Sequence, residues 1–197
     1  MPDKYENFAA LAANEMEGVH YRIHLAARPS PLAVLAPHGG HMEPGSRQIA
    51  QAIAGARFSF YCFESLEKRA RGQGLHITST RFDEPRAMAL LSASDIAIGV
   101  HGRKDKDDPA AVWVGGLHEP FRDAISDMLE RAGFAAKPVG AGHPLSGRDA
   151  TNICNRGRLG AGVQLEMPAR LRQALVADAE RCAAFVAAIH RAFDSLG

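Results

Sequence analysis

The stretch that decides the fold is Pro31–Gly45, which reads PLAVLAPHGGHMEPG. Its apolar run, Leu32–Ala36, has the length and composition of a buried strand and ends at Pro37. A tight turn follows, and it carries two imidazoles and a carboxylate, those of His38, His41 and Glu43. In an open α/β sheet, ligands bind at the carboxyl ends of the strands. We therefore expect this turn to supply part of a metal site.

The composition is that of an ordinary globular domain. The chain has 197 residues, of which 46% are hydrophobic and 23% are charged, and its formal net charge is +1. This length suits one domain, residues 1–197, with a sizeable core. A charge so close to zero gives no reason to expect nucleic acid or an anionic membrane as a partner. No apolar run approaches the roughly 20 residues that span a bilayer.

The cysteines and the N-terminus bear on the compartment. Cys62, Cys154 and Cys182 are odd in number and show no CxxC spacing, which disfavours a disulfide framework and a thiolate zinc knuckle. The first residues show no charged region followed by an apolar one, so no secretory signal is visible. The expected compartment is the cytoplasm.

Strand and helix patterns alternate along the chain, with a charged loop expected over Glu64–Gly74. The expected strands are Val19–Ala27, Leu32–Ala36, Phe58–Phe63, Leu75–Thr80, Asp95–Val100, Ala111–Val114, Phe134–Val139 and Gly162–Leu165. The expected helices are Tyr5–Glu17, Arg47–Ala54, Ala87–Ser92, Glu119–Ala132 and Ala169–Ser195. This alternation predicts a three-layer α/β fold with a mixed, mostly parallel central sheet flanked by helices.

Three of the apolar strands end in a residue that can serve a site: His38, His101 and Glu166. If these strands run parallel, their carboxyl ends lie at one edge and the side chains converge. His38, Glu43 and His101 would then offer two nitrogens and one carboxylate, which is the ligand set of a catalytic zinc site with an open position. Zinc there lowers the pKa of water to about 7 and polarises a carbonyl.

Glu166 arrives on a third strand and is the candidate general base. It would take a proton from the attacking water and return it to the leaving amine. The chemistry needs a carboxylate separate from the ligand Glu43, because a metal-bound carboxylate is a poor proton shuttle.

The other histidines are weaker candidates. His41 shares the turn with His38 and could be a ligand, a substrate contact or a solvent-facing residue. We expect His20 and His24 on the polar face of a strand, and the role of His143 in its glycine-rich loop stays open. Surface positions are expected for His76, His118 and His190.

Three arginines could hold an acidic substrate, because a guanidinium binds a carboxylate through two hydrogen bonds. Arg156, beside Asn155, is the first candidate, and a loop salt bridge is the alternative for it and for Arg148. Arg103 could hold a substrate carboxylate or stabilise an oxyanion. Its alternative is an ordinary surface position in a charged run.

Several motifs together resemble the poly-γ-glutamate hydrolase family, which phages and bacteria encode. They are Glu17-Gly18-Val19 with Tyr21, PHGGHMEPG from Pro37, Val100-His101-Gly102, NICNRG from Asn152, and GVQLE from Gly162. The resemblance runs in order through nearly the whole chain. It implies a compact core similar to that of zinc carboxypeptidases, although His38 and Glu43 are five positions apart here and three apart in those enzymes.

The resemblance also implies a function. It makes His38, Glu43 and His101 the zinc ligands, Glu166 the catalytic glutamate, and Arg156 a contact for the substrate carboxylate. The expected reaction is zinc-dependent hydrolysis of γ-glutamyl amide bonds in poly-γ-glutamate or a related acidic peptide. Phage-type release by lysis is the alternative to a cytoplasmic location. The alternatives are a zinc amidohydrolase or carboxypeptidase acting on small N-acyl amino acids or peptides, and a metal- or peptide-binding module without turnover.

Overall fold

The structure, a computed structural model, describes residues 3–67, 73–106 and 108–197. Its strands are β1 (Tyr21–Ala26), β2 (Leu32–Gly40), β3 (Ser59–Ser65), β4 (Ile96–Arg103), β5 (Val112–Gly115), β6 (Ala136–Pro138) and β7 (Val163–Pro168). Its helices are α1 (Phe8–Ala12), α2 (Ser46–Ala54), α4 (Pro85–Ser92), α5 (Glu119–Arg131), α6 (Ala169–Ala177) and α7 (Ala179–Asp194), with short 3-10 turns at Gln73–Leu75 and Ile153–Asn155.

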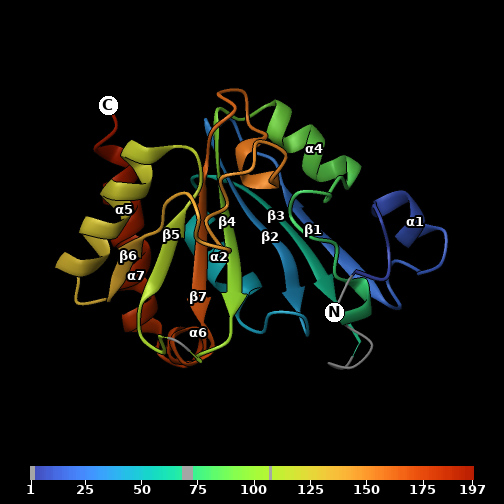
Figure 1. The fold of residues 1–197 in the computed structure, drawn as a ribbon, viewed down its shortest axis with the longest axis horizontal. Coiled ribbons are helices and arrows are strands. Elements are labelled where there is room, and N and C mark those ends of the chain that lie inside the picture. Colours follow the sequence, from blue (N-terminus) through green and yellow to red (C-terminus); the bar gives the residue numbers. More distant parts are fainter. Residues whose placement is uncertain (1–2, 68–72, 107) are drawn as a thin grey trace.

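All these strands form one sheet in the order β1-β3-β2-β4-β7-β5-β6 (Figure 1). The central strands β3, β2, β4 and β7 are parallel, whereas β1 and β5 pair antiparallel with their neighbours β3 and β7. The predicted mixed, mostly parallel sheet is confirmed. Because β2, β4 and β7 run in the same direction, their carboxyl ends meet at one edge, where Figure 1 shows their arrowheads.

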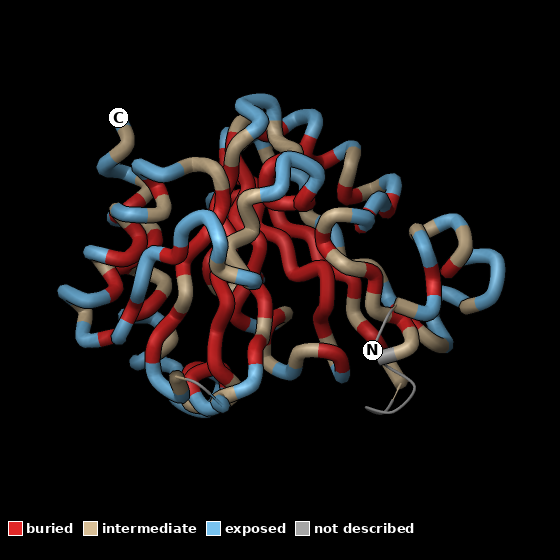
Figure 2. The backbone as a smooth tube through the Cα atoms, in the orientation of Figure 1, coloured by how far each residue is buried: buried red, intermediate tan, exposed pale blue. Residues whose placement is uncertain are grey.

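Helices cover both faces of the sheet, and each face has its own hydrophobic core. One core joins α2, α5, α6 and α7 to strand residues such as Val34, Ile98 and Leu165. The other joins α1 and α4 to the alternate residues of the strands, such as Leu35 and Ala97. Side chains alternate between the faces of a strand, so this pattern makes three layers with the sheet buried between them (Figure 2).

Some expected elements are wrong. Leu75–Thr80 is not a strand: Leu75 ends the 3-10 turn Gln73–Leu75, and irregular chain follows it. The expected first helix is reduced to α1, and the expected long C-terminal helix is two helices separated at Asp178, whose side chain accepts from the N–H of Arg181 and so caps α7. The expected loop Glu64–Gly74 falls partly outside the described residues, and its first two residues belong to β3.

The strand β2 does not stop at Pro37, as the sequence led us to expect, but continues through Gly40. Three steps of β2, from Ala36 to Gly39, match two steps of β3, from Cys62 to Glu64. This bulge inserts one extra residue and so reverses the facing of the residues after it. His38 therefore points to the side of α1 and α4, where its ring meets Phe82.

None of the helices in the described ranges combines the length and the apolar character that a bilayer crossing requires.

Candidate metal centre and active site

Three side chains meet at the carboxyl ends of β2 and β4. His38 Nδ1 lies 3.1 Å from Glu43 Oε1 and 3.2 Å from His101 Nδ1. His101 Nδ1 is 3.7 Å from Glu43 Oε2, and the same oxygen accepts the N–H of Gly102 at 2.7 Å. The structure thus brings the three predicted ligands together.

The outer partners of the two imidazoles leave Nδ1 of each ring facing the centre. His38 Nε2 lies 2.8 Å from the backbone carbonyl of Ile77, which can only accept, so this nitrogen carries the hydrogen. His101 Nε2 lies 3.4 Å from Ser79 Oγ. A ligating histidine uses its second nitrogen in this way. Two converging imidazole lone pairs and a carboxylate are a donor set that fits zinc.

The neighbouring charges shift the pKa values of Glu43 and His101 in opposite directions, each toward its charged form. Burial raises the pKa of Glu43, but His38 and His101 outweigh it and hold this pKa well below the ordinary value. Burial lowers the pKa of His101, and the carboxylates of Glu43 and Glu166 outweigh it and raise the pKa. Glu43 is therefore an ionised carboxylate, the form that binds a cation.

Glu166 lies beside this centre on β7 and is only 6% exposed. Burial raises its pKa to about 7, although the nearby charge of His101 opposes the rise. Gln164 Nε2 donates to Glu166 Oε1 at 2.9 Å, and Asn152 Nδ2 donates to Gln164 Oε1 at 2.9 Å. This chain of amides fixes the carboxyl group while leaving its protonation free to change near neutral pH.

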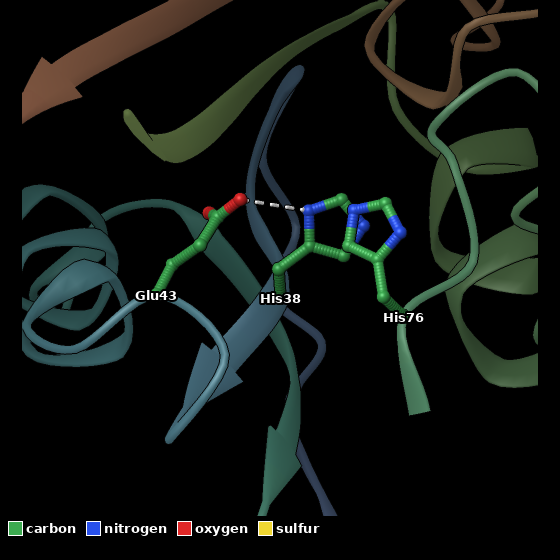
Figure 3. Close-up of side chains that lie close together, drawn as sticks. All are labelled: His38, Glu43 and His76. Carbon is green, nitrogen blue, oxygen red and sulfur yellow. Dashed lines mark hydrogen bonds and ion pairs between the residues drawn. The ribbon is translucent and has the colours of Figure 1, made fainter. Parts of the chain in front are cut away.

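His76 is a fourth candidate ligand, and the expected surface position for it is wrong. Its ring stacks on His38 with 4.1 Å between centroids, and donor atoms of His38, Glu43 and His76 lie within 4.8 Å of one another (Figure 3). Asp3 Oδ1 lies 2.6 Å from His76 Nδ1, so the other ring nitrogen is left for the site. Burial and His38 lower the pKa of His76 and keep it neutral.

Either His76 or His101 can thus complete a triad with His38 and Glu43. A catalytic zinc keeps an open position, which leaves room for three protein ligands. His101 is the stronger third ligand because it is almost fully buried and its Nδ1 faces both other donors, whereas the side chain of His76 is 38% exposed. No sequence pattern points to His76 as a ligand, because its partner Asp3 lies far away in the chain.

The centre forms one wall of a pocket of about 480 Å³. The predicted residues that line it are His38, Glu43, His101, Arg103 and Glu166, and the loop after β6 adds Ser146, Gly147, Arg148 and Asp149. His41, Asn155 and Arg156 are not among the lining residues. His41 is exposed on its turn, and Arg156 Nη1 donates to the carbonyl of Phe82 at 3.2 Å.

The side chains of Asn155 and Arg103, both predicted to bind substrate, are hydrogen-bonded to backbone groups. Asn155 is 2% exposed; its amide donates to the carbonyls of Gly147 and Asp149, and its oxygen accepts two backbone N–H groups. Arg103 donates to three backbone carbonyls and lies 3.7 Å from the centre of the Trp113 ring. Asn155 therefore shapes the loop, and the role of Arg103 toward substrate stays a prediction.

Arg172 on α6 lies under the centre and was not anticipated. It is 5% exposed, and a Cβ on Gly102 would lie only 1.4 Å from its Nη1, so only glycine admits it there. Its positive charge faces Glu43 and Glu166 from the helix side of the sheet. The sequence pattern did not single out Arg172, which lies within the expected helix Ala169–Ser195.

The chain is similar to known proteins over most of its length. The model of the poly-γ-glutamate hydrolase family matches residues 5–185. YndL, a UPF0714 protein of Bacillus subtilis strain 168, is 36% identical over 173 residues, which is 88% of this chain and 67% of YndL. The prophage-derived YoqZ of the same organism is also 36% identical, over 87% of this chain and 61% of its own length.

Two solved structures are similar over almost the full length. A bacteriophage poly-γ-glutamate hydrolase superposes with a TM-score of 0.88 at 31% identity, covering 99% of this chain and 98% of that one. YndL in a form described as apo and zinc-free superposes with a TM-score of 0.90 at 32% identity, covering 98% of both chains.

Proposed function

The chain belongs to the poly-γ-glutamate hydrolase family, and from this membership we propose that it hydrolyses γ-glutamyl amide bonds with the help of zinc. The observation that carries the proposal is the meeting of His38, Glu43 and His101 beside the buried carboxyl group of Glu166. A donor set and a separate proton acceptor in one pocket are what metal-assisted hydrolysis of an amide needs.

The metal ligands in this proposal are His38, Glu43 and His101. When bound, zinc would supply Lewis acidity toward the amide carbonyl and make water more acidic. The description of the YndL structure as zinc-free implies that YndL binds zinc, and YndL is a close relative of this chain. The proposal extends that metal to this protein.

Glu166 performs the proton transfers. Its carboxylate takes a proton from the attacking water, and the resulting carboxylic acid gives a proton to the nitrogen of the leaving amine. A pKa of about 7 lets one group do both steps near neutral pH. The amide of Gln164, itself fixed by Asn152, keeps one oxygen of Glu166 engaged and so aims the other at the pocket.

His76 has a role in shaping the substrate space. Its ring lies against that of His38, both residues line the pocket, and Asp3 fixes the orientation of His76. Because it is neutral and partly exposed, it can accept a hydrogen bond from an N–H group of a bound chain.

The test is to incubate the zinc-loaded protein with poly-γ-glutamate and with α-linked polyglutamate of similar length, and to size the products. The proposal expects shortening of the γ-linked polymer and little change in the α-linked one. Loss of activity on dialysis against a chelator, with recovery on adding zinc, is the second expected result. Cleavage that continues unchanged without bound metal would contradict the proposal.

A further inference from the structure

We propose that Arg148 is the specificity residue that binds the free carboxylate beside the scissile amide of a γ-linked glutamate chain. The inference rests on the proposed function. It replaces Arg156 and Asn155, the residues favoured from sequence, because these do not line the pocket.

The linkage chemistry defines what a specificity residue must do. In a γ-linked chain, the carbon bonded to the amide nitrogen carries a free carboxylate. In an α-linked chain, that carbon carries the next peptide carbonyl, and the free carboxylate lies at the end of the side chain. A cation close to the amide nitrogen therefore distinguishes the two polymers by the position of one charge.

The described residues that line the pocket include two arginines, Arg103 and Arg148. The terminal nitrogens of Arg103 donate to the carbonyls of Lys104, Asp108 and Ala111, which orients its guanidinium within the protein. Arg148 Nη1 instead donates to a carboxylate oxygen of Glu119 at 2.6 Å.

The pair between Arg148 and Glu119 is open to exchange. The two side chains are 28% and 52% exposed. Ion pairs that water reaches contribute about 0–1 kcal/mol, so a substrate carboxylate can take the place of Glu119 at small cost. Asp149, the next residue, turns its carboxylate to the backbone and hydroxyl of Thr151.

The backbone around Arg148 is held firmly on both sides. Asn155 Nδ2 donates to the carbonyls of Gly147 and Asp149, each at 2.8 Å, and so clamps the residues that flank the arginine. The N–H of Gly116 donates to the carbonyl of Ser146 at 2.7 Å. A fixed backbone with an exchangeable side chain is the arrangement that a preorganised binding residue requires.

The loop that carries Arg148 also packs against Gln164, the residue that holds the base Glu166. Gly147 has a φ of +61°, and a Cβ on it would lie 2.9 Å from the Cβ of Gln164. Gln164 is the residue that donates to Glu166. Arg148 thus directly follows the residue that packs against Gln164, and Gln164 orients the base. The positions of Arg148 and Glu166 are therefore fixed relative to each other.

The experiment compares two pentamers of glutamate, one γ-linked and one α-linked, as substrates of the zinc-loaded protein. Arg148→Gln should lower kcat/KM on the γ-linked pentamer by roughly 10- to 100-fold, the usual range for one charged hydrogen bond, mainly by raising KM. Its rate on the α-linked pentamer should stay the same. Arg158→Gln is the matched control, because Arg158 also pairs with a carboxylate, that of Asp95, but lies outside the pocket lining.

Two results would overturn the inference: unchanged kinetics of Arg148→Gln on the γ-linked pentamer, or an equal loss on both pentamers. A selective loss from Arg156→Gln, with none from Arg148→Gln, would also overturn it.

A binding measurement separates this inference from the proposed function. If the wild type cleaves neither pentamer, the proposed function fails, and calorimetric binding of the γ-linked pentamer still tests Arg148. Weaker binding by Arg148→Gln, at least tenfold, supports the inference, and equal binding contradicts it.

Discussion

His101 and Glu166 lie directly opposite each other in the parallel ladder between β4 and β7, where their Cα atoms are paired. Both side chains leave the sheet on the face opposite α6 and α7, since their neighbours Val100, Leu165 and Met167 pack in the core of the other face. The candidate ligand and the candidate base therefore lie on two strands that are hydrogen-bonded to each other. Their separation is set by strand pairing and does not depend on the long loops.

The first prediction concerns Glu166. Glu166→Gln keeps the size of the side chain but removes the proton acceptor, and general-base catalysis contributes about 10²–10⁴-fold. We expect hydrolysis of poly-γ-glutamate to fall by that factor, with zinc content unchanged by elemental analysis. Intact hydrolysis in a metal-loaded Glu166→Gln protein would refute the assignment of the base.

The second prediction decides between the two triads of the metal centre. His38→Ala and His101→Ala should each weaken zinc binding strongly, because each removes a ligand. His76→Ala should weaken it by roughly 10- to 100-fold at most, the usual effect of a residue outside the ligand shell. The measurement is a competition titration with a chromophoric chelator.

His20→Ala is the control for the metal titration, because His20 is partly exposed and paired with Glu15. If His76→Ala costs more zinc affinity than His101→Ala, then His76 is the third ligand and the roles are reversed.

Much of the site could be predicted from the sequence, for a physical reason. His38, His101 and Glu166 each follow an apolar run, and parallel strands bring such positions to one edge. His76 could not be found in this way, because its place depends on Asp3, which lies far away in the chain and leaves no periodic pattern. The sequence could name Arg148 only as one of three candidate arginines, because its place in the pocket depends on the fold of an irregular loop that Asn155 holds through the carbonyls of Gly147 and Asp149.

The exact ends of the strands and helices also differ from those predicted from the sequence. The strand ends were underestimated because glycines such as Gly40 and Gly102 have low strand propensity, and pairing with β3 and β7 overrides it. The break at Asp178 had a visible signal, since aspartate is a favoured N-cap, but the apolar periodicity continued across it. Long-range pairing thus decided where these strands end, and a local cap decided where the last helix begins.

The third prediction is the pH dependence of the metal-free protein. Glu166 has a pKa of about 7 when folded and 4.5 as an ordinary glutamate, so between these values the folded state binds more protons than the unfolded state. The contribution of Glu166 to the free energy of unfolding is therefore present at low pH. It falls by on the order of 3 kcal/mol as the pH rises through about 7.

Urea unfolding of the chelator-treated protein at several pH values measures this effect. Glu166→Gln is the comparison, because it cannot titrate: the difference in unfolding free energy between wild type and variant should move in favour of the variant as pH rises from 5 to 8. A constant difference would show that the pKa of Glu166 is not raised.

The fourth prediction separates the structural role of Asn155 from a direct contact with substrate. Its side chain makes four hydrogen bonds to the backbone at a buried position, so Asn155→Ala leaves donors and acceptors without partners. We expect a loss of roughly 2–3 kcal/mol in unfolding free energy, together with a rise in KM for the γ-linked pentamer through the loosened loop of Arg148.

Combining Asn155→Ala with Arg148→Gln gives the decisive measurement. If Asn155 acts through Arg148, the double variant should have nearly the KM of Arg148→Gln alone, whereas additive effects on KM would mean that Asn155 contacts the substrate itself.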